Sequence, residues 1–311
     1  MIASLMVSWR ARTLRRALGL LMAVIPLAYV TYTIATTGPG LLTAVPNPRY
    51  ELLAAALGLY AACTALGGLL WREALRVLGH DPGLRGAMRQ NLLSAPARYL
   101  PGLGGQSVGK IGLAARSGVP ARAGLAASAL EFIAICASGV LAGFIVLPLA
   151  VDSVPAGLLP TGVRQIGLWP AFVYMLVAPL AFSAVVPRLL TTLAARRLEL
   201  SYVRAAVWLA GISLNWLLVG LSVFLLAGAA FPIGLRDLPV CQLAVVASLL
   251  AGLLAPTPMG LGVREGVLAV LFGALVGPAQ AALLAVGWRL LNVAADGLCF
   301  AIALRLDRGQ D

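Results

Sequence analysis

Long apolar segments constrain what this chain can fold into more than any other feature. A helix needs roughly 20 apolar residues to cross the hydrocarbon core of a bilayer. Six segments meet this requirement, namely residues 17–37, 50–70, 123–149, 166–186, 204–230 and 279–304. Charged residues make up only 11% of the 311 residues, whereas a soluble domain carries about 25%. The sequence therefore predicts an all-α polytopic membrane protein. We expect residues 1–311 to form a single integral membrane domain, with 17–37 as an uncleaved first span.

Two other regions are apolar but are broken by proline and glycine. Residues 84–116 contain Pro96, Pro101 and five glycines between 102 and 112, and residues 240–277 are broken at the stretch APTPMGLGVREG. Proline and glycine clusters end helices, so we expect neither half of either region to be long enough to cross. Irregular backbone at membrane depth is tolerated only inside protein or beside a wet cavity. We therefore predict two re-entrant helical hairpins, giving about eight apolar segments by hydropathy. Two full crossings for 240–277 remain an alternative.

The distribution of arginine and lysine predicts the orientation. With six spans and two hairpins, 16 of the 23 basic residues fall on the side of both termini and three on the other side. Basic residues accumulate in cytoplasmic loops of membrane proteins. We therefore expect both termini and the loop 188–203 to lie in the cytoplasm.

The net charge of +12 has the same explanation. Arginines on cytoplasmic loops and beside anionic lipids account for it better than nucleic-acid binding does, so we expect no nucleic-acid partner. The four cysteines lie inside apolar runs without CxxC spacing, and His80 is the only histidine. This pattern predicts neither a metal site nor a cofactor.

The two broken regions resemble each other in sequence. Each has an Ala-Pro pair followed by a Gly-Leu-Gly triplet, at Ala95-Pro96 with Gly102-Leu103-Gly104 and at Ala255-Pro256 with Gly260-Leu261-Gly262. In both, 29 residues separate the first glycine of the triplet from a charged residue in the next span, Glu131 or Arg289. One hairpin opens from the inside and the other from the outside, which is typical of inverted-topology repeats with a site near the midplane. We predict such a repeat, with units 84–131 and 240–296.

Charged residues inside membrane segments are costly and are functional hypotheses by default. Arg264 and Glu265 follow directly after the second break. Arg264 suits a lipid phosphate and Glu265 a pairing and gating role, and the alternative is a structural salt bridge that pins the hairpin. In the last span Arg289, Asn292 and Asp296 fall at i, i+3 and i+7 and share one helix face. They line a pathway or form a polar seam between helices.

The first unit carries three further charged candidates. Glu131 lies about 13 Å into its span, at 1.5 Å per residue, and is either a partner for a buried arginine or a cytoplasmic-side cap. Arg98 and Lys110 flank the first break; they attract an anionic head group or extend to the interface. Glycines around both breaks allow the backbone to approach a ligand, or simply make the turn. They are Gly102, Gly104, Gly105, Gly260, Gly262 and Gly266.

Two stretches carry a resemblance to a known family. They are APTPMGLGVREGVLAVLF, with a later span ending in WRLLNVAADGL, and ARYLPGLGGQSVGKIGLAAR, followed by Glu131. They resemble motifs of the lysylphosphatidylglycerol synthase transmembrane family, also described as flippase-like domain proteins, over about residues 15–305. The resemblance implies a bacterial or archaeal inner-membrane protein that moves or presents lipids. Two-part members join such a domain to a soluble aminoacyl-lipid synthase. This chain stops at Asp311, so we expect a standalone member that is not an aminoacyl-transferring enzyme.

Lipid translocation is the function that the sequence favours. Two opposed hairpins with charged, glycine-rich tips would supply a groove for the head of an anionic phospholipid or of a polyprenyl- or hopanoid-type lipid. One alternative is an accessory membrane subunit that docks a glycosyltransferase or another lipid-modifying enzyme. Another is an enzyme acting on a polyprenyl-phosphate sugar, which would be expected to carry acids in an outer loop. Loop 38–49 has none, and 150–165 has only Asp152. The sequence leaves a homo-oligomer open.

Overall fold

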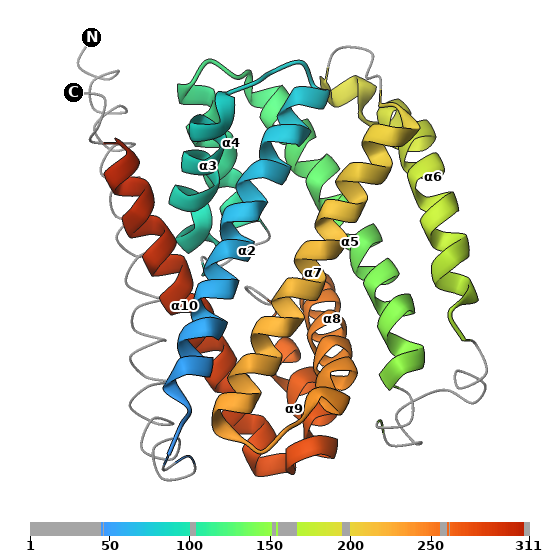
Figure 1. Ribbon diagram of the computed structural model, residues 1–311. Coiled ribbons are helices and arrows are strands. Elements are labelled where there is room, and N and C mark those ends of the chain that lie inside the picture. The colour runs from blue at the N-terminus through green and yellow to red at the C-terminus, as the bar shows by residue number, and fades with distance from the viewer. Residues whose placement is uncertain are drawn as a thin grey trace.

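The computed structural model describes residues 45, 47–99, 104–150, 154, 167–194, 200–255, 260 and 262–307. The regular structure of this part of the chain is helical throughout (Figure 1), which confirms the predicted all-α class. The helices are α2 (Tyr50–Val77), α3 (Gly83–Ser94), η1 (Ala95–Tyr99), α4 (Gly105–Arg116), α5 (Ala121–Ala150), α6 (Trp169–Ala194), α7 (Tyr202–Ala230), η4 (Leu235–Asp237), α8 (Leu238–Leu254), α9 (Val263–Val276) and α10 (Pro278–Asp307). The predicted first span, 17–37, lies outside the described residues.

Six helical segments are long and apolar enough to cross a membrane, so the chain is a multi-pass membrane protein. Five of them overlap the predicted spans, and the sixth is Leu235–Leu254, formed by η4 and α8. We expected neither half of the second broken region to be long enough to cross, and this is wrong for its first half. Pro239 is tolerated in the first turn of α8, and the helix then continues without interruption to the Ala255-Pro256 pair.

Two pairs of helices form hairpins at opposite ends of the molecule (Figure 1). α3 and α4 pack against each other through η1, at the end where α2 finishes and α5 begins. α8 and α9 pack against each other at the other end, between α7 and α10. α9 has 14 residues, about 21 Å at 1.5 Å per residue, and is too short to cross. Re-entry of these hairpins into a bilayer and their relation as an inverted repeat stay predictions.

Each hairpin packs into a hydrophobic core of its own. The first core contains Trp71 and Leu130 together with small residues of α3 and α4. The second contains Phe272 of α9 and Trp288 of α10. Helices α2 and α7 contribute to both cores and pack against each other. They form the scaffold that holds the two hairpins in fixed positions.

Glycines determine the geometry of the second hairpin tip. Gly260 has φ +66° and Gly262 has φ +81°, values that side chains other than glycine rarely adopt. A Cβ at Gly260 would also overlap the backbone of Gly252 in α8. The N–H of Gly262 donates to Glu265 Oε2 at 2.8 Å and so caps the start of α9. The tip therefore places Arg264 and Glu265 in the first turn of α9.

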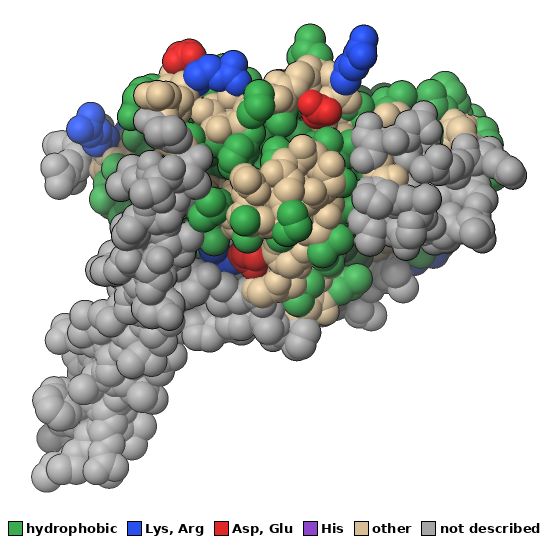
Figure 2. All heavy atoms as spheres, turned by 90° about the horizontal axis from the view of Figure 1, so that it is seen from below, with side chains coloured by type: hydrophobic (Ala, Val, Ile, Leu, Met, Phe, Trp, Pro, Cys, Tyr) green, Lys and Arg blue, Asp and Glu red, His purple; other side chains and the backbone are tan. Residues whose placement is uncertain are grey.

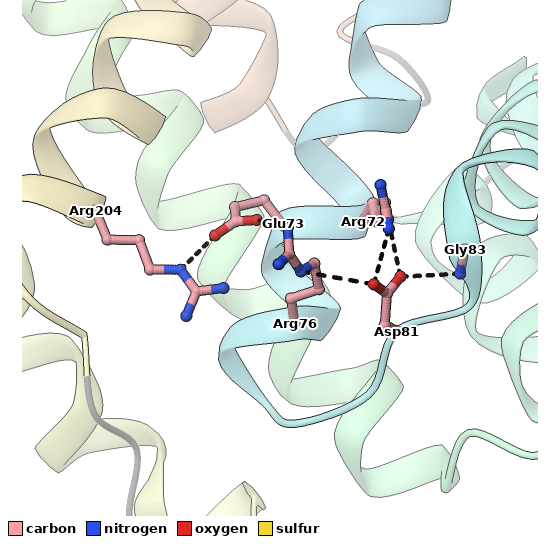
Figure 3. A network of polar contacts seen from close by, with 6 residues as sticks. All are labelled: Arg72, Glu73, Arg76, Asp81, Gly83 and Arg204. Carbon is pink, nitrogen blue, oxygen red and sulfur yellow. Dashed lines mark hydrogen bonds and ion pairs between the residues drawn. The ribbon is translucent and has the colours of Figure 1, made fainter.

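Ion pairs join α2, the α2–α3 turn and α7 at the end of the molecule where α2 finishes (Figure 3). Arg72 donates to both carboxylate oxygens of Asp81 at 2.8 Å, and the Gly83 N–H donates to the same carboxylate at 2.9 Å. Arg204 of α7 pairs with Glu73 of α2. On the opposite face, charged side chains are scattered among hydrophobic ones (Figure 2). Charge thus gathers at the end predicted to face the cytoplasm, and the orientation stays a prediction.

The Asp81 carboxylate should contribute to stability in a pH-dependent way. Its hydrogen bond with Arg72, aided by the Gly83 N–H, lowers its pKa from 3.8 to about 2. The contribution is therefore present above about pH 4, where the carboxyl of the unfolded chain is ionised, and is lost as the pH falls toward about 2. We expect Asp81→Asn to lower the thermal unfolding midpoint in detergent slightly at about pH 6, and the difference to shrink by about pH 3. Glu51→Gln, an exposed carboxylate on α2, is the control. A difference that grows on acidification contradicts the prediction.

Candidate functional site

Both hairpin tips meet the same polar face of α10. Arg289, Asn292 and Asp296 lie along this face and are 8%, 4% and 1% exposed. Arg289 contacts α9 of the second hairpin through Glu265, whereas Asp296 contacts η1 of the first hairpin through Tyr99. The polar face of α10, which the sequence spacing predicts, therefore connects the two hairpins.

The first tip is held at Asp296. The hydroxyl of Tyr99 donates to Asp296 Oδ2 at 2.7 Å. Arg98 Nη1 lies 3.4 Å from the same oxygen and donates to the hydroxyl of Tyr60 at 3.3 Å. The second oxygen of Asp296, Oδ1, is buried and has no hydrogen-bond partner among the described residues. The Asp296 carboxylate thus holds the first tip through one oxygen and leaves the other available.

The second tip is held by an ion pair between Glu265 and Arg289. Oε1 of Glu265 accepts a hydrogen bond from Arg289, and Oε2 accepts one from the N–H of Gly262. Both carboxylate oxygens therefore have a partner. A salt bridge at this hairpin was the alternative that the sequence left open, and the structure pairs Glu265 with Arg289 of α10. Arg264, the immediate neighbour of Glu265, is not its ion-pair partner.

The guanidinium of Arg264 has no hydrogen bond and no ion pair within the described part of the chain. Its aliphatic part packs directly over Gly252, where a Cβ would overlap Cγ and Cδ of the arginine. Ser248 of α8 donates to its backbone oxygen at 2.9 Å. Its electrostatic neighbours include Tyr60, Arg289 and Glu265, and Asp296 interacts with it at longer range than an ion pair. Arg264 is thus a cation held at the junction of the two tips.

A small cavity lies at this junction. Its volume is about 10 Å³, close to the space that one buried water molecule needs. Side chains from both hairpin tips and α10 line it: Tyr99, Arg264, Glu265, Leu268, Trp288, Arg289 and Asn292. The amide Oδ1 of Asn292 is buried and has no partner in the described structure. Most of the surface that lines the cavity is apolar, but two arginines and the amide oxygen of Asn292 also border it.

The charges around the cavity do not cancel. The described ionic groups at the junction are the three arginines Arg98, Arg264 and Arg289 and the two carboxylates of Glu265 and Asp296. At neutral pH with both carboxylates ionised, their formal sum is one positive charge. Such a site is electrostatically suited to a negatively charged group.

Lys110 and Glu131 form a separate buried pair. Lys110 Nζ donates to both carboxylate oxygens of Glu131, at 2.8 and 2.7 Å, and lies 5.0 Å from the ring centroid of Trp71. Lys110 is 5% exposed and Glu131 is 8% exposed. Neither residue lines the cavity. The structure thus does not bring these two candidates to the hairpin junction, and their contacts join α4 to α5.

The glycines named from the sequence have different positions. Gly260 and Gly262 shape the second tip, and Gly104 precedes α4 with φ +93°. Gly105 is the first residue of α4, and Gly102 lies outside the described residues. Gly266 is exposed and lines an apolar groove of about 440 Å³ on α9, and not the small cavity at the junction. Only some of the predicted glycines therefore shape the junction.

Three aromatic residues belong to the junction in addition to the predicted set. Tyr60 receives the Arg98 hydrogen bond, Tyr99 donates to Asp296, and Trp288 lines the cavity and packs edge-on against Tyr60 with ring centroids 5.0 Å apart. Tyr99 had a signal in the sequence, because it directly follows Arg98 in the first break. Tyr60 and Trp288 lie in apolar spans, and the sequence does not distinguish them from aromatic residues of the hydrophobic core. In the described ranges no three His, Cys, Asp or Glu residues gather to hold a metal ion.

Comparison with known proteins assigns the family. The model of the lysylphosphatidylglycerol synthase TM region matches residues 10–298. None of the curated proteins matches the chain. No solved structure matches it either. The matched segment covers nearly the whole chain, including both hairpins and the polar face of α10. The chain therefore belongs to the lysylphosphatidylglycerol synthase TM region family.

Proposed function

We propose that this chain translocates lipids with anionic head groups across the membrane in which it sits. The observation that carries the proposal is the buried junction of two opposed hairpins, with a formal excess of one positive charge. Membership of a family named for a lipid synthase supports a lipid-related membrane role. Charged residues that face the interior of a membrane-embedded helical bundle are typical of substrate pathways.

Arg264 and Arg289 are the groups that would bind the lipid phosphate. A guanidinium binds phosphate through two parallel hydrogen bonds, which gives both affinity and orientation. Arg264 already lies at the cavity without an ion pair to any residue that the structure describes, whereas Arg289 is paired with Glu265. A phosphate that replaces the Glu265 carboxylate at Arg289 would keep that arginine neutralised throughout the exchange.

The described conformation is closed to a lipid head. A cavity of about 10 Å³ is far below the roughly 300 Å³ at which pockets for small organic ligands begin. A head group therefore enters only if one tip moves away from α10. The contacts that must break are the Glu265–Arg289 pair at one tip or the Tyr99–Asp296 hydrogen bond at the other. These two contacts lie on different hairpins. Breaking one of them would therefore open the junction toward one side of the membrane, and breaking the other would open it toward the opposite side.

A reconstituted transport assay tests the proposal. The full chain is inserted into vesicles that contain a trace of fluorescent lipid, and a membrane-impermeant reductant bleaches the label of the outer leaflet. We expect bleaching to exceed half of the label when the lipid has an anionic head, and to proceed more slowly for a zwitterionic one. Vesicles without protein are the control. If bleaching stops at half for every lipid tested, translocation is wrong, and the accessory role beside a lipid-modifying enzyme becomes the better hypothesis.

A further inference from the structure

The closed junction keeps one positive charge that no described residue neutralises. Glu265 shares its two oxygens between Arg289 and Gly262, and Asp296 gives one oxygen to the first tip. The formal excess remains even if Arg264 turns to the free oxygen of Asp296, because three arginines face two carboxylates. A net charge that is held away from water is costly in a protein interior.

The segments outside the described structure that adjoin the tips cannot supply the missing negative charge. Residues 100–103, 256–259 and 261 contain no aspartate or glutamate. The first 44 residues also contain none. A counter-ion from outside the chain is therefore the simplest source of neutrality.

The size of the cavity restricts which anion fits. About 10 Å³ accommodates one water-sized particle. Phosphate, sulfate and carboxylates carry several oxygens around a central atom and do not fit without an opening of the tips. A monatomic anion needs only small shifts of the surrounding side chains. The available space therefore selects a halide over the polyatomic anions.

The lining of the cavity supplies donors for such an ion. Arg264 and Arg289 both line it, and the Arg264 guanidinium makes no hydrogen bond to a described residue. Asn292 also lines it, is 4% exposed and has an unpartnered amide oxygen. Rotation of that amide by half a turn exchanges its oxygen for an NH₂ group. Asn292 can therefore donate to an anion while its oxygen turns toward the arginines.

We propose that the cavity binds one halide ion, chloride under ordinary conditions, when the two tips are closed on α10. The ion neutralises the excess charge of the junction and lies between Arg264, Arg289 and the amide of Asn292. This site does not depend on lipid translocation, because the closed state alone creates the need for an anion. Chloride is then a ligand of the folded state and stabilises it in proportion to its occupancy.

A chloride titration of the purified full chain in detergent tests the site. Thermal unfolding is followed while sodium chloride replaces sodium gluconate at constant ionic strength. We expect a saturable rise in the unfolding midpoint with chloride and with bromide. Sodium sulfate at the same ionic strength should give no such rise. A flat response to chloride, or an equal response to sulfate, overturns the proposal in favour of a cavity that holds water.

Two variants locate the binding. Arg264→Gln removes the excess charge and should raise the apparent dissociation constant for chloride at least tenfold, whereas Arg122→Gln, an exposed arginine at the start of α5, should leave it unchanged. Asn292→Asp places a carboxylate beside the cavity and should make stability independent of chloride even if Arg264→Gln does not fold. A full chloride response in either variant shows that the ion binds elsewhere, which overturns the proposed site. Neither measurement involves lipid movement, so a failure here is distinct from a failure of translocation.

Discussion

Arg264→Gln is expected to slow lipid translocation at least about tenfold without weakening the fold. A hydrogen bond to a charged group contributes about 1.5–3 kcal/mol, and every 1.4 kcal/mol is a factor of ten. In the closed structure the guanidinium of Arg264 makes no ion pair with a described residue, so its removal breaks none. The loss of an uncompensated charge should leave the unfolding midpoint unchanged or raise it in chloride-free buffer. Bleaching rates in vesicles and thermal unfolding in detergent measure the two effects separately.

The neighbouring arginine provides the contrast. Arg289→Gln breaks the pair with Glu265 and leaves a half-buried carboxylate without its cation, which for a buried pair costs about 3–5 kcal/mol. This variant should therefore lose stability and transport together, and it cannot by itself assign a role. Arg122→Gln serves as the control for a general loss of positive charge. If Arg264→Gln folds normally and moves anionic lipid at the original rate, Arg264 does not bind the head group.

The sequence predicted the position of the junction better than its contacts. The glycine-rich breaks, Arg264 and Glu265 after the second one, and the polar face of α10 all follow from composition and helical spacing. They could be predicted because helix breaks and intramembrane charges are local features. The segment before the second break was judged too short because it was taken to begin at residue 240, whereas the helical segment begins at Leu235.

The pairing of the charges could not be predicted, because it depends on which helices pack together. Glu265 pairs with Arg289 on α10, and Lys110 on α4 pairs with Glu131 on α5. In both cases the partner lies in the span that follows the hairpin, 29 residues after the first glycine of the triplet. The signs are reversed between the two pairs. This correspondence supports the inverted repeat, which stays a prediction.

The Glu265–Arg289 pair and the Lys110–Glu131 pair have different surroundings, which indicates different roles. The Glu265–Arg289 pair borders the small cavity at the junction and has Arg264 next to it. The Lys110–Glu131 pair is bidentate, buried and covered by the ring of Trp71, and it does not border the cavity. We infer that the first pair belongs to a site that exchanges ligands and that the second pair fixes α4 to α5.

Lys110→Met is expected to lower the free energy of unfolding by about 3–5 kcal/mol, because it leaves the carboxylate of Glu131 buried without a partner. Glu131→Leu should be destabilising for the same reason, with the ammonium of Lys110 left unpaired. The double variant, Lys110→Met with Glu131→Leu, replaces the pair by apolar side chains and should recover most of the loss. Chemical unfolding in mixed micelles measures all three. Arg76→Met, which removes an exposed ion-pair partner at 48% side-chain exposure, is the control and should cost no more than about 1 kcal/mol.

Transport by the double variant separates a structural pair from a lipid-binding one. If Lys110 and Glu131 only hold α4 against α5, the stable double variant should translocate anionic lipid at a rate within about twofold of the original, well below the tenfold change that 1.4 kcal/mol would produce. Lys110 could instead bind a head group during transport, in which case the double variant would be folded but slow. That outcome would show that the Lys110–Glu131 pair takes part in lipid translocation. It would also require the first hairpin to open between α4 and α5, since the pair is buried there in the closed state.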